Sequence, residues 1–343
     1  MPGVGVTRRD RNRLVLAADG GGSKTDVVLL NTAGEVLAWE RGTGSSPQID
    51  GLAPSVRVID GLVRRALGDR DPRDLDVVGL YLSGLDLAEE IAAFRAAIAP
   101  LPWSPGAIVE NDLHALLRAG TDAQDAVAVI CGTGMNAIGV RADGAQVRFP
   151  ALGPLSGDWG GGAELGDAVV WHAARAEDGR GPHTLLVERL LAAVDASSVA
   201  ALIEDVHLGR RPAQAFAALA PLLFEAAAAG DEVARQVVRR QADEVVAFVR
   251  ACVDRLGLRA VELPVLFGGG VARGRDPLLL ASIHAGLAQH APSARLEIVD
   301  APPVLGAALL VLDAAGAEAT AKVRARDHLS SDLRHAAEPV VAR

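Results

Sequence analysis

One aspartate and the glycines that follow it have the residue types of a phosphate site. Asp19 ends the apolar run 14–18 and precedes a run of three glycines. A carboxylate at the end of a buried strand is costly unless a cation meets it. Hydrated Mg²⁺ is a natural partner for such a group. We therefore expect Asp19 to hold Mg²⁺, through water.

The turn after Asp19 combines backbone N–H groups unobstructed by Cβ atoms with a cation and two hydroxyls, which are the materials of a phosphate cradle. It is neither a Walker A loop nor a dinucleotide fingerprint, because residues 25–30 predict a strand and not a helix. A plain hairpin turn is the alternative hypothesis. The predicted phosphate ligands are Gly20, Gly21, Gly22, Ser23, Lys24 and Thr25.

Two further glycine turns follow predicted strands. Strand 126–130 leads to Gly132, Thr133 and Gly134, and strand 264–267 leads to Gly268, Gly269 and Gly270. Two turns in matching positions can close on one polyphosphate, as in a nucleotide held in an interdomain cleft. The third run lets a backbone approach a flat ligand such as adenine or its ribose. A tight turn and a strand-to-helix connection are the respective alternatives.

A second aspartate, Asp112, stands between the predicted strand 107–109 and the predicted helix 113–119. One hypothesis is a helix N-cap, which is a frequent role of Asp. The other is a general base that takes the proton from a substrate hydroxyl as it attacks a γ-phosphoryl group. The two roles are compatible. The eight histidines lack metal-ligand spacing, so no zinc site is predicted.

The elements that must position these residues follow a pattern that occurs twice. Each copy is a strand, a glycine turn, a strand, a turn and a strand, and this indicates two lobes of like topology. A helical block at 163–257 with heptad-like apolar positions follows the second copy. The predicted strands are 14–18, 25–30, 36–39, 77–82, 107–109, 126–130, 137–140, 145–149, 264–267 and 296–299, and the predicted helices outside the block are 52–67, 87–98, 113–119, 277–290 and 304–315.

The length of 343 residues also favours two domains. We expect an N-terminal lobe at 14–120 and a C-terminal lobe at 121–319 that includes the helical block. Residues 1–13 and 320–343 are polar or charged without an apolar face, which predicts mobile tails.

Composition excludes several classes of protein. Half of the residues are apolar but only 3% are aromatic, which excludes disorder and collagen and predicts a core of small side chains. The net charge of -9 argues against a general nucleic-acid binder. The two cysteines lack paired spacing, so a reduced compartment is expected. With no signal-peptide core and no apolar run of membrane-spanning length, the sequence predicts a soluble cytoplasmic protein with neither membrane nor nucleic-acid partner.

Taken together, these residues resemble the BadF/BadG/BcrA/BcrD ATPase family, in the branch of the actin-like ATPase and sugar kinase superfamily that includes N-acetylglucosamine kinase. Residues 18–25 look like its first phosphate motif, 131–134 its second and 267–271 its adenosine motif. Ser83-Gly84 and Asn111-Asp112 are similar to two further motifs. The resemblance, over 14–315, implies an α/β fold of two actin-like (ribonuclease H-like) lobes, each a mixed sheet with helices, around an interdomain nucleotide cleft.

The same resemblance implies roles for the residues. Asp112 would be the catalytic base, with ATP and Mg²⁺ as cofactors and an amino sugar such as N-acetylglucosamine or glucosamine as the partner substrate. A homodimer is expected. Asp158 and Trp159 match a segment that walls the sugar pocket, where a Trp can stack on a pyranose. The other predicted substrate residues are Ser46, Gln48, Ser83, Gly84 and Asn111.

The chain departs from the amino-sugar kinases on the substrate side. Ser46 is the nearest match to an Asn of those kinases, and Leu165 stands where they have an Asp that contacts the sugar. Glu164 and Asp167 could substitute only after a local shift. The resemblance thus leaves the identity of the sugar open.

Two other functions are weighed against the kinase. Some members of the family are activators that couple ATP hydrolysis to electron transfer, through an iron–sulfur cluster held by two cysteines from each subunit. Here Cys131 and Cys252 are expected to be small buried hydrophobic residues. A nucleotide-binding regulator without turnover is the other alternative, but the sequence shows no evident DNA-binding helix pair.

Overall fold

The computed structural model describes residues 12–336, and of residues 213–215 and 331–336 only the backbone. The chain forms two compact units. Unit 1 takes the chain up to Asp122 and from Val299 onward, and unit 2 is Ala123–Ile298. Residues 1–11 of the tail predicted at 1–13 lie outside the described residues.

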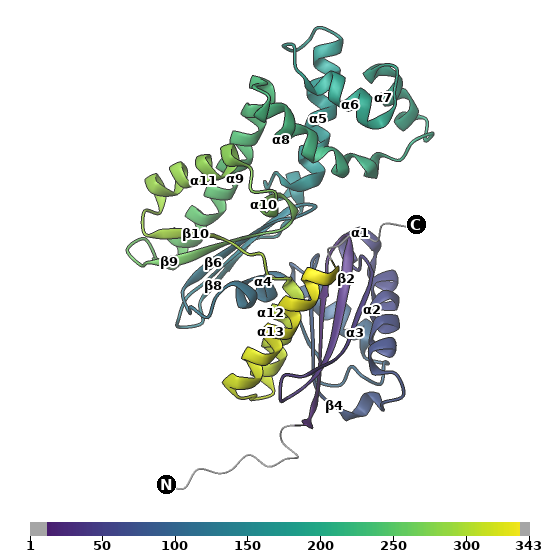
Figure 1. Cartoon of the computed structure of the whole chain (residues 1–343), viewed down its shortest axis with the longest axis vertical. Coiled ribbons are helices and arrows are strands. Elements are labelled where there is room, and N and C mark those ends of the chain that lie inside the picture. The colour runs from purple at the N-terminus through teal and green to yellow at the C-terminus, as the bar shows by residue number, and fades with distance from the viewer. Residues whose placement is uncertain (1–11, 337–343) are drawn as a thin grey trace. The chain divides into compact units, whose positions relative to one another are not determined.

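Unit 1 contains a five-stranded mixed sheet with the order β3-β2-β1-β4-β5 (Figure 1). The first three strands form the predicted antiparallel meander, and β4 and β5 run parallel to β1. Both faces of β1 are buried, so its sequence is a continuous apolar run. The strands are β1 (Leu14–Gly20), β2 (Lys24–Asn31), β3 (Val36–Thr43), β4 (Leu75–Leu82) and β5 (Ile108–Asn111).

Helices cover both faces of this sheet. Leu16 and Ala18 of β1 belong to the core shared with α2 and α3, whereas Val15 and Ala17 belong to the core shared with α4, α12 and α13. The alternation follows from the two-residue period of a strand. The helices of unit 1 are α1 (Pro47–Asp50), α2 (Leu52–Leu67), the 3-10 helix η2 (Pro72–Asp74), α3 (Ala88–Ile98), α4 (Leu113–Gly120), α12 (Pro303–Ala314) and α13 (Ala319–Ala336).

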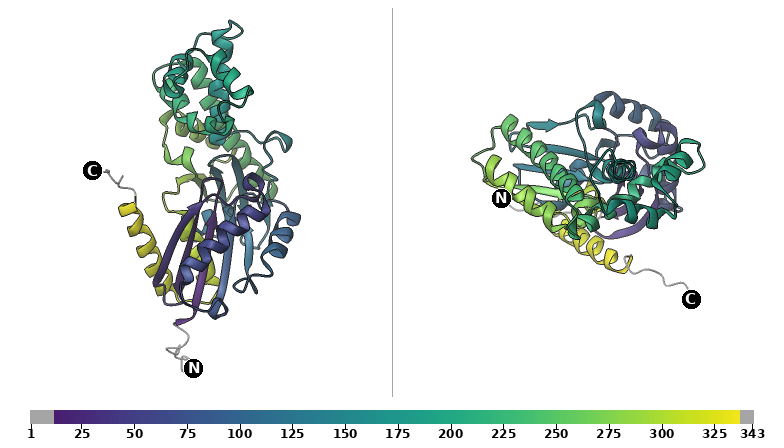
Figure 2. Two further views of the ribbon diagram at one scale, coloured as in Figure 1. Left: turned by 90° about the vertical axis from the view of Figure 1, so that its right-hand side faces the viewer. Right: turned by 90° about the horizontal axis from the view of Figure 1, so that it is seen from above.

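The C-terminal segment belongs to unit 1, which differs from the predicted C-terminal lobe at 121–319. Helix α12 packs on α4 so closely that a Cβ atom on Gly306 would lie 1.8 Å from the carbonyl oxygen of Ala115. The tail predicted at 320–343 is instead helical as far as it is described, because residues 320–336 belong to α13, which lies beside α12 (Figure 2). Its buried Ala321, Ala325 and Leu329 recur every four residues, so the charged helix does have a narrow apolar face. Residues 337–343 lie outside the described residues.

Unit 2 repeats the strand order of unit 1, as the sequence pattern predicts. Its sheet has the order β10-β9-β6-β7-β8, with an antiparallel meander of β6, β7 and β8, and with β9 and β10 parallel to β6. The strands are β6 (Ala126–Cys131), β7 (Met135–Val140), β8 (Gln146–Arg148), β9 (Leu263–Gly268) and β10 (Ala294–Ile298). The predicted α/β fold with two mixed sheets is confirmed.

The predicted helical block forms most of the remainder of unit 2. Helix α9 packs on the sheet and on α11, while α6, α7 and α8 gather around α5 (Figure 1). The helices are α5 (Gly161–Glu177), α6 (Leu186–Val194), α7 (Val199–His207), α8 (Ala220–Ala228), α9 (Glu232–Leu256), α10 (Gly270–Arg273) and α11 (Pro277–His290), with 3-10 helices η3 (Gly153–Leu155) and η4 (Ala213–Leu219). Across residues 12–336, no helix has both the length and the apolar character to cross a membrane.

Candidate functional site

The carboxyl ends of three parallel strands bring the predicted site residues of unit 1 together. Gly20 of β1 pairs with Leu82 of β4, and Leu82 pairs with Asn111 of β5. Beyond the strands, the Ser83 N–H donates to the Gly20 carbonyl at 2.8 Å and the Asp112 N–H donates to the Leu82 carbonyl at 3.3 Å. This edge of a parallel sheet is where α/β proteins commonly bind ligands.

Asp112 is a buried carboxyl group beside other acids. Its side chain is 8% exposed, and Asp19 is 6% exposed. Burial raises the pKa of Asp112 to about 8, and the negative charges of Asp19 and Asp86 add to this effect. A carboxyl group with a pKa near neutrality is poised to exchange a proton during catalysis.

The capping hypothesis for Asp112 is wrong in its side-chain form. Asp112 precedes α4, but its side chain makes no capping hydrogen bond. The neighbouring Asn111 does this instead, because its Oδ1 accepts from the backbone N–H of Leu113 at 3.1 Å. The carboxylate of Asp112 therefore does not cap the N-terminus of α4.

The acidic pair Asp19 and Asp112 has the donor chemistry that suits Mg²⁺, which prefers oxygen ligands and retains much of its water. Among the described residues, no group of three or more His, Cys, Asp or Glu side chains could hold a metal ion by itself. The residues present therefore fit a hydrated ion that receives its other ligands from phosphate oxygens and water.

Ser45 stabilises the first glycine turn through hydrogen bonds. The Gly21 N–H donates to the Lys24 carbonyl at 2.9 Å, and the Ser45 N–H donates to the Gly21 carbonyl at 3.0 Å. The buried Thr25 hydroxyl donates to the Thr43 carbonyl at 2.8 Å and is hydrogen-bonded to Ser45 Oγ, also at 2.8 Å. A Cβ atom on Gly20 would lie 2.4 Å from that Oγ, so only glycine fits there. The side chain of Thr25, predicted to bind phosphate, thus stabilises the turn.

Lys24 forms an ion pair with Asp26, whose carboxylate is fully buried. Arg41 Nε lies 2.7 Å from the same carboxylate and Trp39 Nε1 donates to it at 3.0 Å. Burial acts to raise the pKa of Asp26, but the bonds from Arg41, Lys24 and Trp39 outweigh it and hold the pKa below its usual value. The side chain of Lys24 is 37% exposed, so it is open to a phosphate.

The predicted substrate residues of unit 1 also converge. Gly84 has φ +74°, and a Cβ atom there would lie 2.7 Å from Ser46 Oγ and 3.1 Å from Gln48 Cγ. Asn111 reaches the same loop, because its Nδ2 donates to Asp86 Oδ1 at 2.9 Å. The structure therefore brings Ser46, Gln48, Ser83, Gly84 and Asn111 to the edge that carries Asp112.

In unit 2, the second and third glycine runs lie against each other. Gly269 has φ +96°, and a Cβ atom on it would lie 2.2 Å from the carbonyl oxygen of Cys131. By contrast, Cβ atoms on Gly132, Gly134 and Gly270 would meet nothing within 4 Å. The backbone of Gly132–Gly134 is thus open on one side, as a phosphate-binding turn requires.

The N-terminus of α5 and one buried glutamine hold this turn in place. The N–H groups of Gly162 and Ala163 donate to the carbonyls of Gly132 and Thr133, both at 2.8 Å. The fully buried Gln241 accepts from the Gly161 N–H at 3.0 Å and donates to Met135 Sδ at 2.8 Å. Gln241 therefore links α9 to the first residue after the turn and to the start of α5, which holds the turn.

The two predicted substrate residues of unit 2 have protein partners. Both oxygens of Asp158 accept hydrogen bonds within its own loop, from the Gly153 N–H at 2.8 Å and from the Ser156 hydroxyl. The guanidinium carbon of Arg240 lies 3.8 Å from the ring centroid of Trp159. One face of this indole is thus covered by a cation, so a sugar that stacks there must displace Arg240 or use the other face.

The chain differs from the amino-sugar kinases at Leu165, with Glu164 and Asp167 beside it, and these three residues have distinct environments. Leu165 is fully buried in the core of unit 2. Glu164 Oε2 is buried and has no hydrogen-bond partner among the described residues, and burial raises the pKa of this carboxyl group. Glu164 also acts on Cys131 through its charge, which puts it near the second glycine turn.

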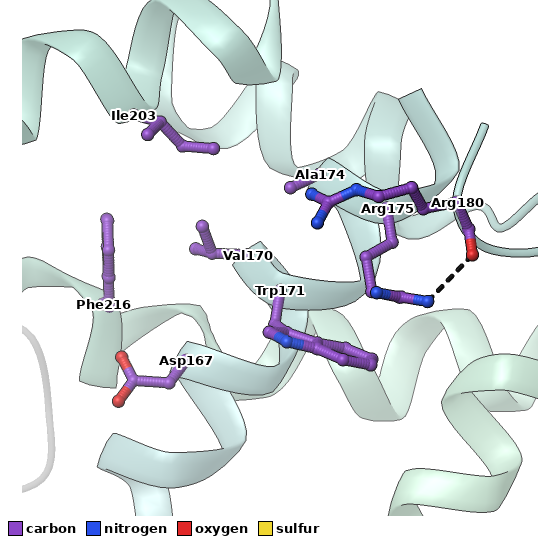
Figure 3. A pocket seen from close by; sticks show the side chains of 8 residues that line it. All are labelled: Asp167, Val170, Trp171, Ala174, Arg175, Arg180, Ile203 and Phe216. Carbon is purple, nitrogen blue, oxygen red and sulfur yellow. Dashed lines mark hydrogen bonds between the residues drawn. The ribbon is translucent and has the colours of Figure 1, made fainter. Parts of the chain in front are cut away.

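Asp167 lines a pocket of about 370 Å³ that the sequence did not predict (Figure 3). Trp171 and Phe216 form aromatic walls, and Arg180 lies at the side opposite Phe216. The remaining lining residues are Val170, Ala174, Arg175 and Ile203.

Both cysteines are free and fully buried in the core of unit 2, as predicted. Burial raises the pKa of each thiol to about 12. Cys252 packs beneath Gly139, where a Cβ atom on the glycine would lie 2.8 Å from the cysteine Cβ. These thiols are in the surroundings of structural residues, not those of cluster ligands.

Four positioning residues were missed by the sequence analysis: Ser45, Asp26, Asp86 and Gln241. Only Gln241 had a signal, because it lies four residues from Val237 and from Val245 on the apolar face of a predicted helix. The other three depend on contacts between segments that are far apart in the chain.

Comparisons with known proteins identify the family of this chain and its fold. The model of the BadF/BadG/BcrA/BcrD ATPase family matches residues 18–311. The N-acetyl-D-glucosamine kinase of Dictyostelium discoideum is 28% identical over 313 residues, which cover 88% of this chain and 98% of that protein. The N-acetylmuramic acid/N-acetylglucosamine kinase of Clostridium acetobutylicum is 26% identical, with 76% and 85% covered.

A solved structure of a Chromobacterium violaceum protein has a TM-score of 0.70 and 26% identity, covering 88% of this chain and 99% of that one. The fold is therefore the actin-like fold of sugar kinases. With a family model that spans most of its length, this chain belongs to the BadF/BadG/BcrA/BcrD ATPase family.

Proposed function

We propose that the protein is an ATP-dependent kinase that transfers the γ-phosphoryl group to a hydroxyl of an amino sugar, with Asp112 as the general base. The observation that carries the proposal is the state of Asp112. Its carboxyl group is buried, is not used in the helix cap, and has a pKa of about 8. A base with a pKa near the working pH is ionised in a useful fraction of the molecules and still binds a proton strongly enough to drive its transfer.

In this mechanism Asp112 accepts the proton of the sugar hydroxyl while that oxygen attacks the γ-phosphorus. The bond from the γ-phosphorus to the bridging oxygen breaks, and ADP leaves with the electron pair. Backbone N–H groups of the two phosphate turns, Gly20–Thr25 in unit 1 and Gly132–Gly134 in unit 2, are proposed to bind phosphate oxygens, apart from those of Gly21 and Gly132, which donate within their own turns. Gly268–Gly270 are proposed to line the nucleoside.

Asp19 is the proposed holder of Mg²⁺, through water. When bound, the ion supplies positive charge that neutralises the phosphate oxygens. The negative charge of Asp19 raises the pKa of Asp112, and a cation held by Asp19 would reduce this effect.

An amino sugar is the proposed acceptor because two relatives similar along most of their length are kinases of N-acetylglucosamine or related sugars. Ser46, Gln48, Ser83, Gly84 and Asn111 are proposed to form the unit 1 side of the sugar site, and Asp158 and Trp159 to contribute from unit 2. A cytoplasmic, homodimeric enzyme is part of the proposal, and light scattering during size-exclusion chromatography tests the dimer.

The proposal is tested by supplying ATP and Mg²⁺ with a panel of hexoses, hexosamines and N-acetylhexosamines, and by measuring ADP release together with the mass of the product. We expect a sugar monophosphate with one or more amino sugars and little ADP release without a sugar. ADP release that no sugar stimulates would contradict the proposal. A protein purified without oxygen that contains stoichiometric iron would favour an electron-transfer activator instead.

A further inference from the structure

Asp86 lies at the N-terminus of α3 and is held there by its own helix. Glu90 Oε2 accepts from the backbone N–H groups of Asp86 and Leu87, at 2.8 and 2.9 Å. This is one of the two bonds of a capping box, the one in which a glutamate in the first helical turn accepts from the backbone at the helix start. It fixes the direction in which the chain enters the helix. The backbone of Asp86 is therefore held at the start of α3.

The two oxygens of Asp86 accept hydrogen bonds from two different segments. Oδ1 accepts from Asn111 Nδ2 at 2.9 Å, and Oδ2 accepts from Gln48 Nε2 at 3.3 Å. Asn111 is the neighbour of Asp112 in the chain, and Gln48 lies in α1. Asp86 thus connects the segment that carries the proposed base to the segment that carries the proposed sugar contacts.

These bonds determine which group is left for a ligand. Asn111 is fully buried and uses its Oδ1 on the Leu113 N–H and one hydrogen of Nδ2 on Asp86, so it is held beside Asp112 and exposes no group to a ligand. Gln48 uses both hydrogens of Nε2, on Asp86 Oδ2 and on Glu90 Oε1 at 3.2 Å, so its Oε1 remains. Because a carboxylate only accepts hydrogen bonds, Asp86 forces both amides into this orientation.

From this geometry we propose that Asp86 is a positioning residue for the acceptor site, which holds the buried Asn111 beside the proposed base and orients Gln48 as a hydrogen-bond acceptor toward the hydroxyls of the sugar. The inference rests on the proposed kinase function and deepens it. Asp86 itself does not touch the substrate. The effect of its charge on the pKa of Asp112 supports its closeness to the base.

Replacing one acceptor oxygen of Asp86 with a donor tests the orientation of the Gln48 amide. In Asp86→Asn, the new side chain can still accept from Asn111, but its NH₂ faces the NH₂ of Gln48, so the Gln48 amide must turn over. We expect the KM for the sugar to rise at least tenfold, with the KM for ATP unchanged. Glu89→Gln is the matched control, because it removes one exposed negative charge on the same helix turn and should change neither constant.

Charge exchange provides the rescue. Gln48→Glu alone places two carboxylates against each other and should raise the sugar KM as well. Because Gln48 also donates to Glu90, the rescue is made in a Glu90→Gln background, where Gln48→Glu combined with Asp86→Asn restores a donor opposite each acceptor and should recover most of the affinity for the sugar. If this combination is no better than Gln48→Glu in the same background, Asp86 does not act through Gln48 and the inference is overturned.

A measurement that needs no activity separates this inference from the proposed function. The losses in melting temperature caused by Asp86→Ala and by Asn111→Ala should be less than additive in the double variant, because both remove the same contact. Additive losses would overturn the inference even in an active kinase. A wild-type protein that phosphorylates no sugar but shows this coupling would refute the kinase and retain the contact.

Discussion

The amide oxygen of Asn111 caps helix α4 in place of the carboxylate of Asp112, its neighbour in the chain. Capping by Asp112 would have stabilised its charge with the N–H groups and dipole of the helix and lowered its pKa. Burial and the charges of Asp19 and Asp86 outweigh the backbone N–H groups of Asp112 and Leu113, which act to lower the pKa of Asp112. A residue that precedes a helix can therefore have the pKa of a base.

The first prediction concerns the stability of the protein as a function of pH. Unfolded Asp112 ionises near pH 4, whereas in the folded protein its pKa is about 8. The folded state therefore binds more protons between these values, and stability falls as the pH rises through this range. Asp112→Asn removes the effect, so the variant should melt higher than the wild type at pH 8, by about 2 °C or more, and the gap should narrow toward pH 5. An equal difference at both pH values would contradict the assigned pKa.

A second prediction separates the two partners of the buried ion pair. Asp26→Ala should destabilise unit 1 by about 2–4 kcal/mol, since it leaves three donors without their acceptor, although the exposure of Lys24 and Arg41 reduces the cost. Lys24→Met should cost at most about 1 kcal/mol, because Arg41 and Trp39 still bind Asp26. If Lys24 binds phosphate, this variant should nevertheless lose about tenfold or more in ATP affinity. Denaturant titration and nucleotide titration measure the two effects.

The third prediction compares two adjacent glycines. Gly269→Ala forces a Cβ atom to within 2.2 Å of the Cys131 carbonyl at a positive φ, so it should cost about 3 kcal/mol or more and displace the turn 132–134. Gly270→Ala meets no atom within 4 Å and should change the melting temperature little. Both variants are compared by thermal melting with and without ATP. A Gly269→Ala protein as stable as the wild type would show that the two glycine runs do not touch.

The fourth prediction concerns the carboxylates beside Leu165. Glu164 has a buried oxygen without a partner among the described residues, whereas Asp167 lines the separate pocket of Figure 3. If a carboxylate near this turn binds the sugar, Glu164→Gln should raise the sugar KM about tenfold or more, and Asp167→Asn should not. Steady-state kinetics on the two matched variants decides between them, and the reverse pattern would assign the role to Asp167.

The sequence predicted the elements of the fold better than their grouping. The glycine turns and the two strand meanders were local patterns, so they were found. The return of α12 to unit 1 depends on the contact of Gly306 with Ala115, across almost 200 residues of chain, which no local pattern encodes. In the candidate site, Asp19 and Asp112 were found because strand ends mark them. Asp86 was missed because only the folded loop brings it to Asn111 and Gln48.

The central claim is that Asp112 is the base that activates a sugar hydroxyl. The most direct measurement is the rate of sugar phosphorylation by Asp112→Asn, with ATP binding measured by titration on the same preparation and with the exposed Asp74→Asn as the control variant. The account predicts a loss of about 10²-fold or more in the rate, ATP affinity close to that of the wild type, and full activity of Asp74→Asn. Wild-type turnover by Asp112→Asn would contradict it.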